Sequence, residues 1–174
     1  AETSTGSIYT RFGDKEGLFR AIVAPAVAEF EEMIAKEMDA FNQRSGDMPV
    51  EEMFRYTAQR LEQLVDSVYN RFDVFKILIC FADGTEYENF LHRLAEIEVK
   101  QTIRYIEAIG NDALQSGRLS RALLHMLSSA YWAGVFQTVE HDMPRDEALQ
   151  YVGQLKRFYR RGWNDIFFPA EGAL

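Results

Sequence analysis

The sequence lacks the features that define several protein classes. Its single cysteine, Cys80, excludes an internal disulfide, and four prolines and eleven glycines among 174 residues are too few for a fibrous or linker-rich chain. No apolar run approaches the roughly 20 residues that span a bilayer, and the first residues are not a basic-then-apolar leader. We therefore expect a soluble, cytoplasmic protein with no membrane partner.

The chain also has no excess of positive charge. Its 19 Lys and Arg residues stand against 27 Asp and Glu residues, which gives a net charge of −8, and contacts with nucleic-acid phosphates need the opposite sign. Residues 1–24, however, carry three basic and three acidic side chains, so the whole net charge of −8 lies in residues 25–174. Acidity thus excludes a DNA surface spread over residues 25–174, but not one confined to residues 1–24.

What the sequence does contain is helical periodicity. Apolar residues recur at spacings of three and four, and β-branched residues form no strand-like runs, so we predict an all-α bundle. Asp14 suits the N-cap of the first long helix, and Pro25 predicts a kink in it or a break into two helices. Pro49 and Pro144 suit the first positions of two later helices. The predicted ranges are about 14–43, 49–68, 72–82, 85–115, 120–140 and 144–168.

The N-terminus carries the most informative motif. Hydroxyl side chains and a tyrosine on a short helix, with basic residues beside them, are what a helix that reads a DNA groove requires. The run is Ser4-Thr5-Gly6-Ser7-Ile8-Tyr9-Thr10-Arg11-Phe12-Gly13-Asp14-Lys15-Glu16-Gly17-Leu18-Phe19. A short part of it fits an ordinary capped turn equally well, whereas the whole ungapped run favours DNA recognition.

This run resembles the end of the helix-turn-helix in the TetR family of transcriptional regulators, Ser-Lys-Gly-Thr-Ile-Tyr-x-x-Phe-x-x-Lys-Glu-x-Leu-Phe. Thr5 stands where the family often has Lys, and Ser7 keeps the hydroxyl of the family's Thr. The resemblance implies that Ile8, Phe12, Leu18 and Phe19 belong to the core. The DNA-contacting residues that it implies are Ser4, Thr5, Gly6, Ser7, Tyr9, Thr10, Arg11 and Lys15.

The resemblance implies a TetR-like fold in two units. Residues 1–24 would be the C-terminal remnant of a helix-turn-helix domain, with the recognition helix and the start of the connecting helix, and residues 25–174 an effector-binding and dimerisation domain. Family members carry two further helices before this point. We therefore expect operator DNA to be bound only when those helices are present.

An effector pocket is expected among the aromatic residues of the central helices. On a helical wheel Glu98 falls on the inward side of its helix, so it should be paired, protonated or exposed to a cavity; alternatively the helix shifts and Glu98 is solvated at the boundary. For each aromatic residue, plain core packing is an alternative. The pocket candidates are Phe72, Phe75, Phe90, Leu94, Glu98, Thr102, Tyr105, His125, Trp132 and Phe136.

The last two helices are expected to form a homodimer interface. The helix from Ser120 is apolar nearly all round, which requires cover on every side, and TetR-family proteins dimerise through two C-terminal helices in a four-helix arrangement. The run Phe158-Tyr159-Arg160-Arg161-Gly162-Trp163 also looks like the usual end of the family. The interface candidates are Met126, Ala130, Ala133, Tyr151, Leu155, Tyr159 and Ile166.

No motif of catalysis or cofactor binding is visible. His92, His125 and His141 lie on separate helical turns without a Glu-x-x-His spacing, so we expect no metal and no cofactor. Cys80 lies in an apolar helix and is expected to be a buried, inert thiol. We predict a non-enzymatic, homodimeric regulator, a repressor, that releases DNA when it binds a small apolar or amphipathic effector. The alternatives are a helical ligand-binding or scaffolding module that never contacts DNA, and an all-α enzyme built on Glu98.

Overall fold

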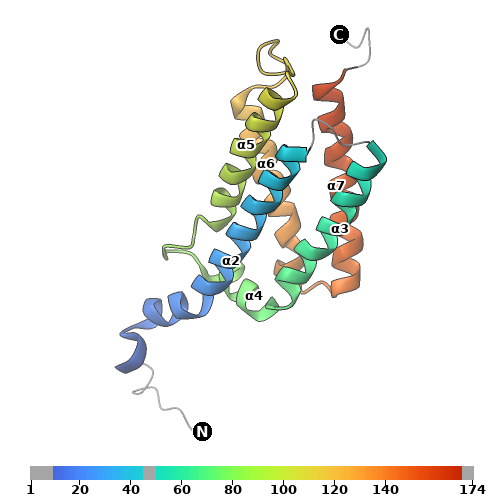
Figure 1. Cartoon of the computed structure of the whole chain (residues 1–174). Coiled ribbons are helices and arrows are strands. Elements are labelled where there is room, and N and C mark those ends of the chain that lie inside the picture. The colour runs from blue at the N-terminus through green and yellow to red at the C-terminus, as the bar shows by residue number, and fades with distance from the viewer. Residues whose placement is uncertain (1–9, 45–49, 170–174) are drawn as a thin grey trace.

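The computed structural model describes residues 10–44 and 50–169, and it is helical without any strand over these ranges (Figure 1). The prediction of an all-α fold is thus confirmed. Residues 10–12 form one helical turn that precedes the first long helix. None of the described helices is both long and apolar enough to cross a membrane. The helices are α2 (Lys15–Arg44), α3 (Val50–Tyr69), α4 (Phe72–Phe81), α5 (Phe90–Ala108), α6 (Arg121–Glu140) and α7 (Arg145–Phe167).

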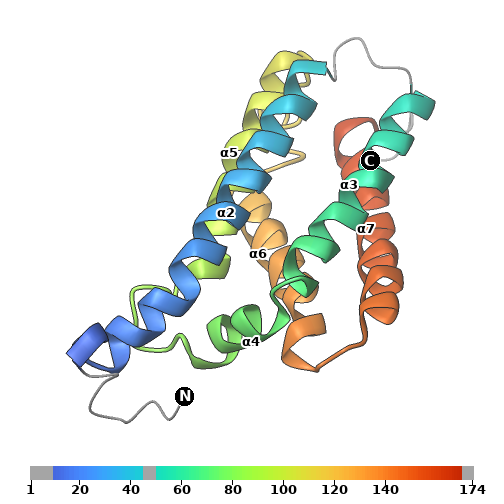
Figure 2. The same cartoon turned by 60° about the horizontal axis from the view of Figure 1, so that its bottom comes forward.

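The helices form two groups joined at one end. Helix α5 packs against α2 and α6, and α3 packs against α7. Helix α6 also contacts α7 and α4, so it connects the two groups. Figure 2 shows α2 and α5 running together on one side, α3 and α7 on the other, and α4 at the end where the groups meet. At the far end the two groups diverge (Figure 2).

Phe30 of α2 lies at the centre of the core. Its ring is 3% exposed and lies 5.3 Å from the ring of Phe75 in α4, 6.1 Å from Phe90 in α5, and 5.8 and 6.2 Å from Phe136 and Trp132 in α6. Such tilted and edge-on pairs stabilise a core beyond their buried area. One side chain thus contacts three other helices.

Several helix ends lie where the sequence predicts them. The Asp14 carboxylate accepts a hydrogen bond from the Gly17 N–H at 2.7 Å, which confirms its capping role. The Ser120 hydroxyl accepts from the Leu123 N–H at 3.0 Å and begins α6. Pro144 is the N-cap of α7, so the helix begins at Arg145, one residue later than predicted. Helix α2 continues through Pro25 as one helix and changes direction in its first half (Figure 1), so the break into two helices is wrong.

Helix α5 is shorter than the predicted range of 85–115. Before it, the Thr85 hydroxyl donates to the Ala82 carbonyl at 2.7 Å and accepts from the Tyr87 N–H at 3.1 Å, which favours a turn over a helix. After it, Gly110 adopts φ +62° and ends the helix in the left-handed region. The predicted range is too long at both ends, because these turns compete with the apolar periodicity. An irregularity is expected at Gly110-Asn111, and there the helix ends altogether.

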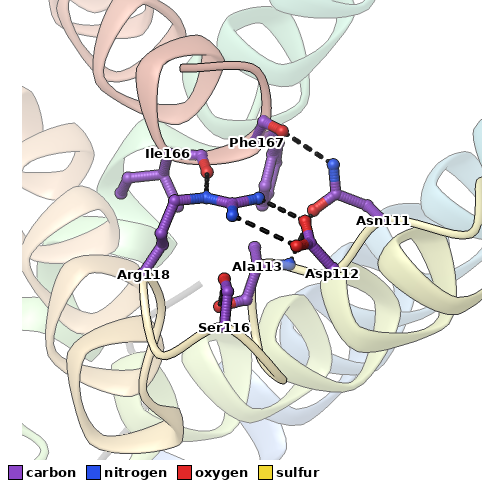
Figure 3. A network of polar contacts seen from close by, with 7 residues as sticks. All are labelled: Asn111, Asp112, Ala113, Ser116, Arg118, Ile166 and Phe167. Carbon is purple, nitrogen blue, oxygen red and sulfur yellow. Dashed lines mark hydrogen bonds and ion pairs between the residues drawn. The ribbon is translucent and has the colours of Figure 1, made fainter. Parts of the chain in front are cut away.

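The connection between α5 and α6 is bonded to the C-terminal end of α7 (Figure 3). The Arg118 guanidinium donates to the Ile166 carbonyl at 3.0 Å and pairs with Asp112 at 2.5 Å, while the Asn111 amide donates to the Phe167 carbonyl at 2.7 Å. The last carbonyls of a helix have no partner within the helix. These side chains supply partners for two of them and hold the end of α7 against α5 and α6.

Replacing Phe30 with Ala tests the central position of this ring. We expect a loss of about 3–5 kcal/mol in the free energy of unfolding, because the truncation removes contacts with three helices and leaves a cavity. Urea denaturation followed by circular dichroism measures the loss. Phe81→Ala is the matched control, since Phe81 is 67% exposed and its truncation should change stability by less than about 0.5 kcal/mol. Equal effects of the two substitutions would contradict the assignment.

Candidate functional site

A cavity of about 420 Å³ lies between the two groups of helices. Helices α2, α3, α5, α6 and α7 all contribute to its walls, which are mainly apolar and aromatic. Its volume falls in the range of small-molecule sites in proteins. The cavity exists because α3 and α7 pack against each other and contact the α2–α5–α6 group mainly through α6 and α4.

Glu98 of α5 is the main polar group on the inner wall. Its atom Oε2 is buried and has no hydrogen-bond partner in the described part of the chain, and the same is true of the indole Nε1 of Trp132. Burial raises the pKa of Glu98 to about 8, and the nearby Trp132 indole offsets the rise only in part. Of the alternatives for Glu98, the structure therefore supports a protonated carboxyl that lines a cavity.

Three phenols and a lysine add further polar groups to the cavity wall. Burial raises the pKa of Tyr131, Tyr159 and Tyr105, so these phenols are protonated at neutral pH and can donate hydrogen bonds. Burial, and to a lesser extent the charge of Arg160, lowers the pKa of Lys156 to about 8. The aromatic wall of the cavity therefore carries a neutral carboxylic acid, phenol groups that can donate hydrogen bonds, and a lysine that loses its proton more easily than in water.

The walls also contain groups that are already paired. Glu37 of α2 forms an ion pair of 2.5 Å with Arg60 of α3, which joins the two groups of helices across the cavity. Gln101 of α5 is buried, accepts from the Asn42 amide at 3.0 Å and donates to Asp39 at 2.8 Å. These bonds fix the positions of α2, α3 and α5 around the unpartnered Glu98.

The structure brings together only part of the predicted pocket. Glu98, Thr102, Tyr105 and Trp132 line the cavity. The other aromatic and aliphatic candidates belong to the closed core around Phe30, because α4 and the first half of α5 pack directly on α2 and α6; these are Phe72, Phe75, Phe90, Leu94 and Phe136. His125 lies outside the cavity, with its Nδ1 3.2 Å from Glu96 Oε1.

Sequence reasoning missed most of the wall contributed by α2, α3 and α7. Helix α2 supplies Met33, Met38 and Phe41, and α7 supplies Lys156 and Trp163. The pattern that could have indicated them is the amphipathic character of each helix, but periodicity does not tell which apolar faces meet without filling the space between them.

The predicted DNA-contacting residues fall mainly outside the described residues, namely Ser4, Thr5, Gly6, Ser7 and Tyr9. Thr10, Arg11 and Lys15 are exposed, and the Arg11 guanidinium lies 5.3 Å from the centre of the Phe12 ring. Gly17 has a packing requirement, because a Cβ there would lie 2.0 Å from the Phe12 carbonyl oxygen. The turn that precedes α2 is therefore compact and presents basic side chains to solvent.

The predicted dimer residues occupy two different environments. Met126 is 67% exposed, and Ala130 and Ala133 of the same helix are also exposed. The residues of α7 are half-buried within the chain instead. Tyr151 and Leu155 pack on the core around Phe30, Tyr159 contacts Tyr131 and lines the cavity, and Ile166 packs on a smaller cluster near Phe167.

Substituting Glu98 with Gln tests the buried carboxyl through pH. In the unfolded chain Glu98 ionises near pH 4.5, whereas in the folded chain it holds its proton to about pH 8. Stability of the natural chain should therefore fall as pH rises between these values, by an amount on the order of 3 kcal/mol relative to Glu98→Gln between pH 5 and 7.5. Lys156, whose pKa burial lowers to about 8, is present in both proteins, so its titration cancels in this difference.

Urea denaturation of both proteins at several pH values measures this difference. Glu107→Gln is the matched control, because Glu107 is an exposed residue of the same helix. A stability difference between Glu98→Gln and the natural chain that is constant over pH 5–7.5 would show that Glu98 ionises as in water.

The chain was also compared with known proteins. No protein-family model, no curated protein and no solved structure matches it.

Proposed function

We propose that the chain is part of a TetR-type one-component transcriptional regulator, a homodimeric repressor that releases operator DNA when a small molecule binds the cavity. The N-terminal motif supports the DNA-reading part of this proposal, and the aromatic cavity supports the effector-binding part. Residues 1–24 then belong to the DNA-binding unit, and residues 25–174 to the effector-binding and dimerisation unit.

The observation that carries the proposal is the course of α2. This single helix begins at Lys15, inside the motif, and its other half supplies Met33, Glu37 and Phe41 to the cavity wall. A helix of 30 residues is about 45 Å long. A ligand that displaces the wall would therefore displace the end of α2 that carries the motif.

A second connection runs through α5. Arg20, near the start of α2, forms an ion pair with Glu86 in the turns before α5, and the Phe19 ring lies 6.1 Å from the ring of Tyr87. Glu98 lies further along the same α5. The two helices that contribute Phe41 and Glu98 to the cavity are thus joined near the motif. Movement of either helix would change the orientation of the motif.

The mechanism that follows is a shift between two populations. A ligand releases DNA only if it binds the non-DNA-binding arrangement more tightly, with a coupling of roughly 1–3 kcal/mol or more. The aromatic wall favours an apolar or amphipathic molecule. Its polar group would bond to Glu98 Oε2, which is buried without a hydrogen-bond partner, and to the neighbouring Trp132 indole N–H, which lowers the cost of burying these atoms.

The outer face of α6 supports the dimer. Leu123, Met126, Ala130 and Ala133 recur at spacings of three and four, and Leu123 and Met126 are 39% and 67% exposed. Phe158 of the adjacent α7 is 75% exposed. A second copy of the chain would cover these side chains in a two-fold arrangement.

DNA selection tests the regulatory function. The complete natural chain that contains these residues should enrich one sequence from a random pool and bind it with salt-dependent affinity. Compounds that raise the melting temperature of residues 1–174 should release that DNA. Thr102→Phe fills the cavity and should abolish both the melting shift and the release, without changing DNA affinity. Ala108→Phe, on the exposed end of α5, is the control and should change neither.

The outcomes separate the candidate functions. Specific DNA binding that no cavity ligand alters would contradict the effector mechanism. Cavity ligands without any DNA binding would favour a helical ligand-binding module instead. Turnover of a bound compound that is lost in Glu98→Gln, with binding retained, would favour an enzyme.

A charge on α6 tests the dimer separately. Met126→Glu should convert the dimer to a monomer in light-scattering or sedimentation measurements, because a desolvated carboxylate is costly in an apolar interface. Phe81→Glu is the matched control, since Phe81 is also 67% exposed but lies on α4. A natural chain that is monomeric at micromolar concentration would overturn the proposed interface.

A further inference from the structure

Two histidines and a carboxylate from two helices meet on the surface of the protein, outside the cavity. His92 and Glu96 lie four residues apart on α5, and His125 comes from α6. Glu96 Oε1 is 3.8 Å from His92 Nε2 and 3.2 Å from His125 Nδ1. The two imidazole rings have centres 5.2 Å apart at an angle of 71°.

These distances match the spacing of ligands around a metal ion. Zinc binds imidazole nitrogen and carboxylate oxygen at about 2.0–2.2 Å, so two ligand atoms of one tetrahedral site lie roughly 3.4 Å apart. The ligand atoms of His92, Glu96 and His125 all lie within 4.8 Å of one another. Small side-chain rotations therefore bring all three atoms to one ion without moving either helix.

The sequence spacing did not indicate this cluster. A Glu-x-x-His motif places ligands three residues apart, whereas His92 and Glu96 use the spacing of four, which also keeps both on one helical face. The third residue, His125, is contributed by α6 and meets the pair only because α5 packs against α6.

The chemistry of the three groups selects the class of ion. Imidazole nitrogen suits zinc, copper, cobalt and nickel, whereas magnesium and calcium prefer an all-oxygen shell. His92, Glu96 and His125 have side chains that are 55%, 58% and 36% exposed. An ion can therefore enter from solvent, and water can complete its coordination.

We propose that His92, Glu96 and His125 bind one first-row divalent transition-metal ion and thereby join α5 to α6. The proposal does not depend on the function proposed above, because it rests on other residues. An ion that binds the folded chain more tightly than the unfolded chain lowers the free energy of the folded state and so stabilises it. The ion acts as a cross-link between two consecutive helices, in addition to the connection that joins them.

The test measures Zn²⁺ binding to the tag-free chain after treatment with a chelator. Competition against a chromophoric chelator should give one Zn²⁺ per chain, and Zn²⁺ but not Mg²⁺ should raise the melting temperature. His92→Ala, His125→Ala and Glu96→Gln should each weaken binding by at least about 100-fold, since even the loss of groups behind the ligands costs 10–100-fold. Each variant should keep the melting temperature of the metal-free natural chain.

The chain offers its own controls. His141 is the third histidine of the sequence and accepts or donates a hydrogen bond with Gln137 at 2.9 Å, away from the cluster; His141→Ala should bind Zn²⁺ as the natural chain does. Cys80 is exposed, so the prediction of a buried thiol is wrong. Cys80→Ser therefore serves to exclude a thiolate ligand. With Co²⁺, the visible spectrum should show nitrogen and oxygen ligands and no thiolate band.

Three results would overturn the proposal. These are the absence of Zn²⁺ binding tighter than about 1 mM, binding that survives in both His92→Ala and His125→Ala, and binding that His141→Ala or Cys80→Ser abolishes. The first would mean that Glu96 only pairs with the histidines, and the others would place the ion elsewhere.

Discussion

The packing of aromatic rings around Phe30 is the constraint on which the rest of the structure depends. Phe75, Phe90 and Phe136 contact this ring from three helices and fix how α2, α4, α5 and α6 cross. Trp132 belongs to both environments, because its ring contacts Phe30 and its indole nitrogen borders Glu98. The closed core therefore determines one wall of the cavity, and a ligand that moves Trp132 acts directly on the packing of α2.

The cavity and the buried carboxyl both lower the stability that the core provides. Space without atoms forfeits dispersion contacts, and a polar group without a partner keeps its desolvation cost. A protein shaped only by stability would fill the space between α3 and α5 and replace Glu98 with an apolar residue. Backbone and side-chain bonds at the ends of the bundle, such as those from Arg118 to Asp112 and Ile166, hold the walls in place around this unfavourable centre.

The predictable part of the structure is the part encoded locally. Helix class, the cap at Asp14, the start of α6 near Ser120 and the inward direction of Glu98 follow from neighbours along the chain. The late start of α5 was missed because Thr85 forms a turn that periodicity does not register, whereas Gly110-Asn111 was an expected irregularity and the helix ends before it. The cavity walls and the cluster around Glu96 depend on which faces meet between distant helices, and a single sequence leaves those pairings open.

The cavity has an optical consequence. The chain contains two tryptophans, and both Trp132 and Trp163 line the cavity. Indole emission depends on the polarity and mobility of its surroundings, so nearly all tryptophan fluorescence of this protein originates at the wall of one space. Light emitted by the unlabelled protein is thus a direct report on whether that space is wet, dry or filled.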